Sequence, residues 1–305
     1  MPLQWKVTGG QRYSDEPGLA EGLCLKFSSY LAGACILLRK IVTAMKTKTA
    51  LVTGAASGFG FEFAKLLASD RYALILADKD EARLAMVKEQ LQDQFNVPAG
   101  TIVSDLSKPQ AASEIYAETK DMAIEILINN AGYGLFGFFT QTDWEKEEKM
   151  IGLHVTTTTH LTKLFVSDMV KRGNGKIMNV SSMAAFQPGP LMAVYYATKT
   201  YLLSFTEALA NEVKGTGVTV TAFCPGQTKT GFQDNVARAS NAHRSKSTWI
   251  ADPAKVARVG YHAMQSGKPL SVPGVGNKSI VLLNRFLPRR VVISLVRILQ
   301  ENIRK

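Results

Sequence analysis

Residues 49–60 of the chain read TALVTGAASGFG, and this stretch decides the fold. Its first five residues form a short apolar, β-branched run, which is typical of a buried strand. A glycine-rich turn follows, and residues 59–70 then show the apolar spacing of a helix. Glycines allow a tight turn and a close approach of the backbone to a pyrophosphate, whose charge the unpaired N–H groups of a helix N-terminus can bind. The residues predicted to bind a dinucleotide here are Gly54, Ser57, Gly58, Phe59 and Gly60.

Strand and helix patterns alternate along most of the remaining chain. Residues 72–77 form a second apolar run, and residues 79–95 have a helical pattern. Further strands are predicted at 101–105, 123–132, 175–182 and 217–226, and the helices between them include long segments at 143–172 and 195–214. Strands that are apolar throughout and are separated by helices indicate a parallel sheet with helices on both faces.

An acidic residue, Asp78, stands at the end of the second predicted strand, 24 positions after Gly54. A carboxylate at this place accepts hydrogen bonds from the adenosine ribose hydroxyls and repels a 2′-phosphate, which favours NAD as the cofactor. Ser57 is not basic and offers that phosphate no positive partner, whereas Lys79 keeps NADP as the less favoured alternative. Asp78 also suits the role of a cap for a helix that begins near residue 80.

A candidate proton-transfer site lies in residues 179–199, NVSSMAAFQPGPLMAVYYATK. A phenol with its ordinary pKa of about 10 is a poor proton donor or acceptor at neutral pH. Lys199 lies one helical turn after Tyr195, so its ammonium is expected to favour the phenolate and lower the pKa of Tyr195. The hydroxyl of Ser182 can hydrogen-bond the oxygen of a reacting carbonyl or alcohol. Tyr196 lacks a lysine four residues later, so Tyr195 is the candidate.

The net charge of +11 is concentrated at the two ends of the chain. Residues 1–48 carry seven basic and three acidic side chains, a net +4, and residues 278–305 carry seven and one, a net +6. Residues 49–277 carry 22 and 21, a net +1. The near-neutral body argues against nucleic-acid binding there, and the basic ends fit either peripheral contact with a membrane or an acidic partner, or simply solvated termini. The three cysteines form no metal-ligand spacing and no disulfide framework, so we expect no metal and a reducing, cytoplasmic location.

The sequence allows more than one role for each end of the chain. In residues 1–46, the longest apolar stretch is Phe27 to Leu38, 12 residues. A spanning helix needs about 20, so this extension is expected to be a leader or a docking helix. Residues 1–44 are a dispensable leader if Met45 is the natural start. Residues 273–305 form a basic amphipathic tail, which indicates either a membrane-facing helix or a helix that caps the substrate pocket.

The motifs together resemble the short-chain dehydrogenase/reductase family over about residues 47–272. They are TGAASGFG, NNAG at 129–132, Ser182, Tyr195, Lys199 and Pro-Gly at 225–226. The gap of 13 residues between Ser182 and Tyr195 matches the family spacing and selects Ser182 over Ser181. The resemblance implies an α/β fold in a single domain, with a Rossmann-like, doubly wound parallel sheet of about seven strands. It also implies an NAD(P)-dependent oxidoreductase that assembles as a homodimer or homotetramer.

Residue roles follow from the same resemblance. Tyr195 would be the general acid or base, Lys199 would also bond the nicotinamide ribose, and Ser182 would orient the substrate oxygen. Further cofactor contacts are implied for Asp105, Asn130, Ala131, Gly132, Pro225, Gly226, Thr228 and Thr230. The NNAG turn also fits a role in stabilising the sheet, and Asp105 also fits a cap for the following helix.

His154 departs from the family pattern, which has an asparagine at this place in the long central helix to hold a water in a proton relay. Histidine can donate, accept and shuttle protons near neutral pH, which predicts a modified relay. A packed polar residue is the alternative reading.

The expected reaction is the interconversion of a secondary alcohol and a ketone. Phe186, Leu191 and Met192 favour an apolar, lipid-like substrate if they line the pocket, and packing against the sheet edge is their alternative. Two other functions use the same fold: a dinucleotide sensor without catalysis, and a scaffold on a membrane surface.

Overall fold

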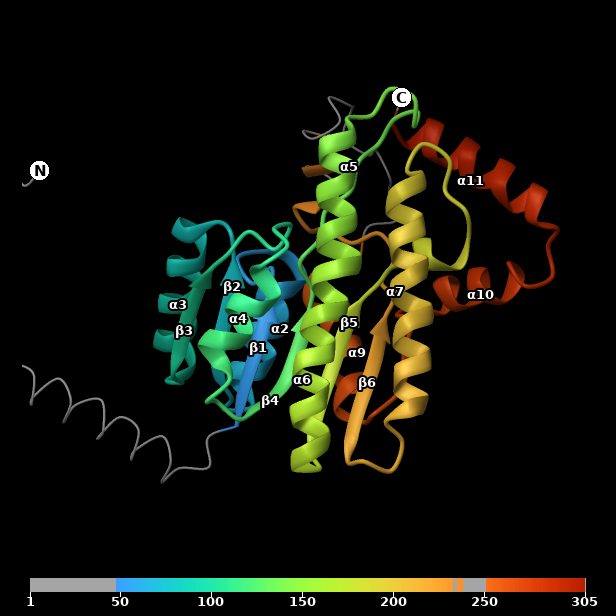
Figure 1. The fold of residues 1–305 in the computed structure, drawn as a ribbon. Helices are drawn as coiled ribbons and strands as arrows, with labels where there is room; N and C mark the ends of the chain where they lie inside the picture. The colour runs from blue at the N-terminus through green and yellow to red at the C-terminus, as the bar shows by residue number, and fades with distance from the viewer. Residues whose placement is uncertain (1–47, 233–234, 238–250, 305) are drawn as a thin grey trace, which may run out of the picture. The chain divides into compact units, whose positions relative to one another are not determined.

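The computed structural model describes residues 48–232, 235–237 and 251–304, so the predicted extension at 1–46 lies outside the described residues. Seven strands form one sheet in the order β3-β2-β1-β4-β5-β6-β7, and every pairing is parallel (Figure 1). The strands are β1 (Thr49–Thr53), β2 (Ala73–Asp78), β3 (Ala99–Val103), β4 (Ile124–Asn129), β5 (Gly175–Val180), β6 (Val218–Phe223) and β7 (Leu270–Ser271). The predicted doubly wound α/β fold is confirmed.

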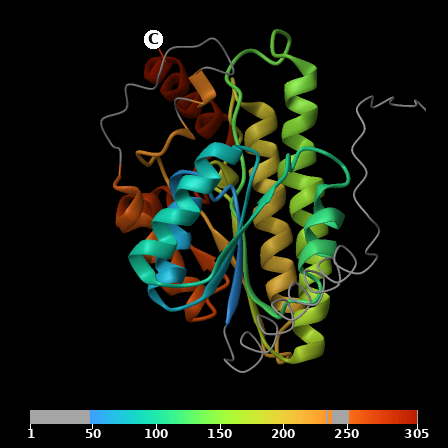
Figure 2. The ribbon, with the colours of Figure 1, turned by 90° about the vertical axis from the view of Figure 1, so that its left-hand side faces the viewer.

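Helices cover both faces of the sheet, as Figure 2 shows from the side. They are α2 (Gly58–Ser69), α3 (Glu81–Phe95), α4 (Ala111–Thr119), α5 (Trp144–Ile151), α6 (Thr158–Arg172), α7 (Ala193–Glu212), α9 (Pro253–Gln265), α10 (Val275–Leu283) and α11 (Arg289–Arg304). On one face α2, α3 and α9 bury a core that includes Phe63 and Tyr261. On the other face α4 and α6 bury a second core that includes Ile115 and Phe165. The apolar strands are therefore covered on both sides, as their sequence requires.

The long central helix predicted at 143–172 is interrupted. Between α5 and α6 the chain forms a π-helical segment, Gly152–Thr157, which contains His154. A π turn inserts an extra residue into the helical repeat and is frequent at functional sites. It therefore changes which side chains of this helix point toward the sheet.

The strand order places a crevice between the carboxyl ends of β1 and β4. The chain runs from β1 outward through β2 to β3, and then crosses back so that β4 lies on the other side of β1. Ligands of open α/β sheets bind at such a point, where the direction of winding reverses. The loops after β1 and β4 are joined there, because the backbone N–H groups of Asn130 and Ala131 donate to the hydroxyl of Thr53 at 3.0 and 3.2 Å.

The basic tail, expected from residue 273, folds as α10 and α11 and belongs to the same compact unit as the sheet, which spans Lys48–Lys305. One side of α11 is buried through Val292, Val296 and Gln300, which recur at every fourth residue. The two valines pack against a cluster that contains Tyr195 and Tyr196 of α7. Within the described residues, none of the helices combines the length and the apolar character needed to cross a bilayer.

Candidate active site

The glycine loop between β1 and α2 forms one end of the candidate site. Gly54 has a φ of +65°, and a Cβ atom there would lie 2.8 Å from the Cα of Ala131, so only glycine fits this turn. Ser57 precedes α2, but its side chain forms no capping hydrogen bond, and the first turn of α2 has no acidic residue. The N–H groups at the start of α2 are thus available to a phosphate, as the sequence predicts.

Asp78 lies beside this loop at the end of β2. Its carboxylate accepts hydrogen bonds from the backbone N–H of Ala56 at 3.0 Å and of Asp80 at 3.1 Å. The alternative reading of Asp78 as a helix cap is wrong, because Asp80 caps α3 by accepting from the N–H of Arg83. Asp78 therefore both braces the loop and presents a negative charge where an adenosine ribose would lie. Lys79 and Arg83 line the same region.

Asp105 follows β3 and also faces this region. Burial raises its pKa, but hydrogen bonds from the hydroxyl and N–H of Ser107 outweigh this effect and leave the pKa below its usual value. Asp105 does not cap α4, because Gln110 occupies the capping position of that helix. It instead stabilises the turn at 105–107 while lining the site.

The NNAG turn after β4 supports the glycine loop directly. The side-chain amide of Asn130 donates to the carbonyl groups of Thr53 and Gly54 at 3.0 and 3.1 Å. Asn130, Ala131 and Gly132 all line the site. The predicted alternative, a stabilising role for this turn, thus coexists with its place at the site.

Ser182, Tyr195 and Lys199 come together at the carboxyl end of β5 and the start of α7. The Ser182 hydroxyl lies close enough to the Tyr195 phenol to lower its pKa, and its oxygen accepts from the N–H of Ala184 at 3.1 Å. Lys199 donates to the carbonyl of Val180 at 2.9 Å, and its Nζ lies 5.8 Å from the centroid of the Tyr195 ring. Both Tyr195 and Lys199 are buried.

Burial dominates the ionisation of this group. It raises the pKa of Tyr195, against the effect of the nearby Ser182 hydroxyl, which lowers it. Burial also lowers the pKa of Lys199 to about 8. The expectation that Lys199 lowers the pKa of Tyr195 is wrong for these residues, because the cost of burying a phenolate is larger than any stabilisation from the ammonium.

Ser181 has a different role from its neighbour. Its hydroxyl donates to the backbone carbonyl of Lys199 at 2.8 Å, so it holds the lysine-bearing turn of α7 against β5. The choice of Ser182 from its spacing to Tyr195 agrees with this arrangement, since Ser182 acts on the pKa of the phenol while the Ser181 hydroxyl is bonded to Lys199.

His154 lies beneath the site with both ring nitrogens bonded to protein groups. Its Nε2 accepts from the N–H of Tyr133 at 3.2 Å. Its Nδ1 lies 2.9 Å from the hydroxyl of Thr198, which itself donates to the carbonyl of Tyr195, so Nδ1 carries the proton. Burial and the nearby Lys199 hold the pKa of His154 well below its usual value. This geometry favours the packed neutral residue over a proton relay.

The close packing of His154 depends on Gly132. A Cβ atom at Gly132 would lie 2.8 Å from Nε2 of His154 and 3.5 Å from Nζ of Lys199. The loop after β4 therefore passes over the imidazole at a distance that only glycine allows.

The loop after β6 closes the site from the other side. The hydroxyl of Thr228 donates to the carbonyl of Gly226 at 3.0 Å, and the backbone of Thr228 bridges to Ala251. Thr230 packs against the glycine loop. A Cβ atom built on Gly58 would lie 3.3 Å from the Cβ atom of Thr230. Pro225, Gly226, Thr228 and Thr230 all line the site, and their contacts with the cofactor stay a prediction.

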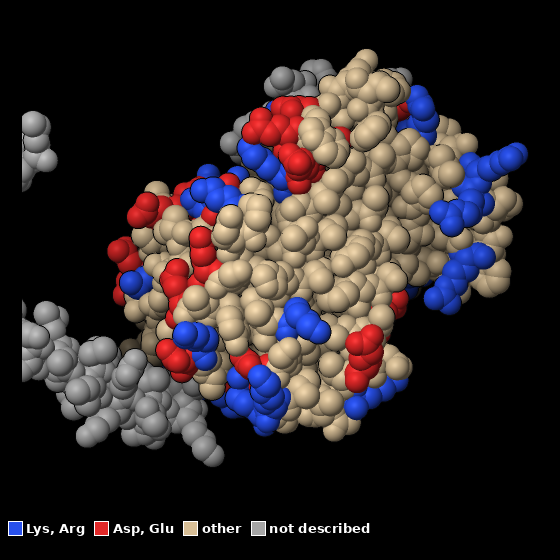
Figure 3. All heavy atoms as spheres, in the orientation of Figure 1, with Lys and Arg blue, Asp and Glu red and all other residues tan. Residues whose placement is uncertain are grey.

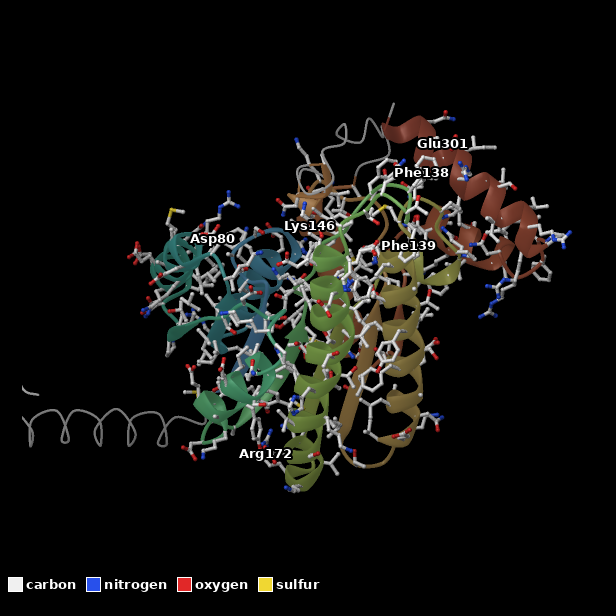
Figure 4. All side chains as sticks on the ribbon, turned by 45° about the horizontal axis from the view of Figure 1, so that its top comes forward. Asp80, Phe138, Phe139, Lys146, Arg172 and Glu301 are labelled. Atoms are coloured by element: carbon white, nitrogen blue, oxygen red, sulfur yellow. The ribbon has the colours of Figure 1, made fainter. Side chains whose placement is uncertain are left out.

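These parts surround one continuous cavity of about 1830 Å³. Ligand pockets usually measure about 300–1,000 Å³, so this cavity has room for a dinucleotide together with a substrate. Figure 4 shows Asp80 and Lys146, which line its rim, at the end of the molecule where the strands end, and Arg172 at the opposite end.

The apolar end of the cavity is formed by the tail. Its aliphatic lining residues, which the motifs did not identify, are Ile280, Leu283, Leu287, Val292, Leu295, Val296 and Leu299. The amphipathic pattern of residues 273–305 is the signal for them, and the structure supports the reading of a helix that caps the pocket. Met192 lines the cavity as expected, whereas Phe186 packs in a separate cluster beside α7 and Leu191 lies outside the cavity.

The fold and the site together define an oxidoreductase that uses a nicotinamide dinucleotide. A family model for short chain dehydrogenases matches residues 48–241, and the chain belongs to this family. An uncharacterized oxidoreductase of Staphylococcus saprophyticus is 30% identical, over 75% of this chain and 95% of its own.

Two solved structures extend the comparison to bound cofactors. A short-chain dehydrogenase from Sphingobium yanoikuyae in complex with NADPH is 26% identical with a TM-score of 0.72, covering 78% of this chain and 93% of its own. A short chain dehydrogenase/reductase from Burkholderia phymatum in complex with NAD is 25% identical with a TM-score of 0.70, covering 82% and 95%. The relatives thus bind a nicotinamide dinucleotide, and they differ in which one.

Proposed function

We propose that the protein interconverts a secondary alcohol and a ketone, with NAD as the preferred cofactor and an apolar, lipid-like compound as the substrate. The observation that supports this proposal is that Ser182, Tyr195 and Lys199 line one cavity together with the glycine loop. The glycine loop lies at one end of that cavity, and the apolar side chains of α10 and α11 lie at the other.

The residues fit a nicotinamide dinucleotide, since the turn at Gly54 leaves no room for a side chain and the start of α2 has no capping side chain. When bound, the nicotinamide supplies the hydride donor or acceptor for the substrate carbon. Tyr195 transfers the proton: in ketone reduction its hydroxyl gives a proton to the substrate oxygen, and in alcohol oxidation its phenolate takes one. Because burial raises its pKa, the phenol is in the donor form at neutral pH.

Ser182 and Lys199 position the groups between which the proton moves. The Ser182 hydroxyl lies beside the phenol and lines the cavity, so it would hold the substrate oxygen beside Tyr195. Lys199, anchored to the carbonyl of Val180, keeps a positive charge below the ring. Proton transfer by a positioned side chain contributes roughly 10²–10⁴-fold to the rate.

The preference for NAD rests on Asp78. Its carboxylate is fixed by two backbone N–H groups at the place that a ribose 2′-phosphate would occupy in NADP. The basic side chains of Lys79 and Arg83 nearby are the features that favour NADP instead.

The substrate class follows from the lining of the far end of the cavity. The side chains that residues 275–300 contribute there are aliphatic, apart from Asn277, Asn284 and Gln300. An aliphatic wall favours apolar ligands, because their burial removes hydrocarbon surface from water.

The test is a comparison of Tyr195→Phe with wild type on a panel of ketones and alcohols of increasing chain length, with NADH and NADPH. Tyr195→Phe should lose roughly 10²–10⁴-fold in kcat while the Kd for the dinucleotide stays the same. Tyr201→Phe, an exposed tyrosine on the same helix, is the matched control. A wild-type protein that binds the dinucleotide and turns over none of the panel would support the sensor instead, and lost dinucleotide binding in Tyr195→Phe would make the tyrosine structural.

A further inference from the structure

The helices α10 and α11 present a large apolar surface that no described residue covers. Leu282, Leu283, Phe286, Leu295, Ile298 and Leu299 are each more than half exposed, and together we call them the tail surface. No residue of α10 is buried, although most of its side chains are apolar. Contiguous exposed apolar patches of this kind mark surfaces that bind a partner or a membrane.

Basic side chains flank the tail surface. Lys278, Arg285, Arg289 and Arg290 are all exposed. Glu301 is the single acidic residue in residues 278–305, and it is paired with Arg297 at 2.9 Å. Figure 3 shows the blue side chains gathered over α10 and α11 with few red ones between them, in contrast to the mixed charges near α3 and α5. The surface is therefore both apolar and strongly positive.

This combination selects one kind of partner. An amphipathic helix with an apolar face and flanking arginines binds at the interface of an anionic bilayer, where each basic residue contributes about 1 kcal/mol. A second copy of the chain fits less well, since a symmetric contact would bring two sets of these arginines together.

The mouth of the substrate cavity opens on the same surface. Leu283, Leu295 and Leu299 are half-exposed and also line the cavity, so they belong to both. An apolar substrate dissolved in a bilayer could pass these three side chains into the cavity without crossing water.

We propose that the tail surface docks on an anionic lipid bilayer and that the apolar substrate enters the cavity directly from it. The docking is interfacial, since no described helix can cross the membrane. The route of entry rests on the proposed function, whereas the docking itself does not.

The first experiment is flotation of the full chain with phosphatidylcholine vesicles, with and without phosphatidylserine. Wild type should float with the anionic vesicles and much less with the neutral ones or in high salt. Leu282→Glu/Phe286→Glu should lower the partition coefficient by at least about tenfold, and neither residue lines the cavity. Met86→Glu/Val259→Glu, which changes two exposed apolar side chains elsewhere, is the matched control and should float like wild type.

A second measurement separates docking from catalysis. With a short water-soluble ketone, Leu282→Glu/Phe286→Glu should retain wild-type turnover, whereas with a long-chain ketone presented in anionic vesicles its turnover should fall in parallel with flotation. If the two glutamates prevent folding, Arg285→Gln/Arg289→Gln serves as the second variant. It should weaken flotation with anionic vesicles and leave flotation with neutral vesicles unchanged.

The outcomes are distinct. If the tail variants float like wild type, the docking proposal is overturned, even if the ketones are turned over. If the same variants also shift from dimer to monomer in sedimentation, the tail surface is a contact between copies of the chain. Flotation that depends on the tail, with no ketone turned over, leaves the docking intact and overturns the function proposed above.

Discussion

The side-chain amide of Gln300 donates a hydrogen bond to the phenol oxygen of Tyr196 at 2.8 Å, although the two residues are 104 positions apart. Tyr196 directly follows Tyr195, so the last helix of the chain is bonded to the turn of α7 that carries the candidate acid. A second polar contact, from the side-chain amide of Asn284 to Gln187, joins the region after α10 to the loop before α7. The wall of the cavity is thereby fixed relative to the proton-transfer group.

The bond between Gln300 and Tyr196 should be measurable as a coupling energy. We expect Gln300→Met and Tyr196→Phe each to lower the free energy of unfolding by about 1 kcal/mol, because each removes a buried hydrogen bond. The double variant should lose less than the sum of the two, as is usual for residues in contact. Urea unfolding of the four proteins gives the cycle, and strictly additive losses would show that the bond contributes nothing.

Replacing Asp78 should change the choice of cofactor. In Asp78→Asn the shape and one acceptor remain but the negative charge is lost, while Lys79 and Arg83 stay in place. We expect the ratio of kcat/KM for NADPH to that for NADH to rise by about tenfold, which corresponds to about 1.4 kcal/mol of lost repulsion. Asp93→Asn removes an exposed charge from the far part of α3 and is the control. An unchanged ratio in Asp78→Asn would contradict the assigned role.

His154 should make stability depend on acid pH without affecting catalysis. Its pKa in the folded protein is far below the value of about 6.5 in the unfolded chain. The unfolded state therefore binds the proton first, and stability falls as the pH decreases below 6.5, by about 1.4 kcal/mol per pH unit. His154→Asn should abolish this slope and leave the apparent pKa values of kcat/KM unchanged. A shifted pH–rate profile would instead restore the proton relay.

Lys199 should make the stability of the protein depend on pH in the alkaline range. Its pKa is about 8 in the fold and about 10.5 when unfolded, so the unfolded state holds the proton between these values and the stability of wild type rises with pH. Relative to Lys199→Met, wild type should gain about 2 kcal/mol between pH 7.5 and 9.5. The measurement is urea unfolding of both proteins at several pH values, and a constant difference between them would mean that the ammonium is not destabilised by burial.

Six of the seven strands could be predicted from the sequence to within a few residues, because apolar β-branched runs between glycine turns leave few other structures. The strand β7 was missed: it has two residues, and only its pairing with Ala222 and Phe223 of β6 defines it. The π-helical turn at Gly152–Thr157 likewise has no sequence signal, since an inserted residue leaves the composition of the helix unchanged.

The site could be predicted where a motif fixes the local backbone, and less well where packing decides. Helical spacing identified Tyr195 and Lys199, the family resemblance added Ser182, and the structure brings the three together. The pKa of Tyr195 was predicted in the wrong direction, because the burial that raises it comes from residues distant in sequence, among them Phe232, whose ring lies 5.4 Å away. The same applies to the capping of α3, for which the sequence suggested Asp78 and the structure shows Asp80 accepting from the N–H of Arg83.

The two ends of the cavity are formed by different segments of the chain, and this has an evolutionary consequence. The cofactor end of the cavity is encoded before residue 232, whereas most of its aliphatic wall is encoded by residues 280–299. Changes confined to residues 280–299 would thus alter the aliphatic wall while leaving the residues around the glycine loop unchanged. A graft of this short segment between paralogues would exchange selectivity in a single step.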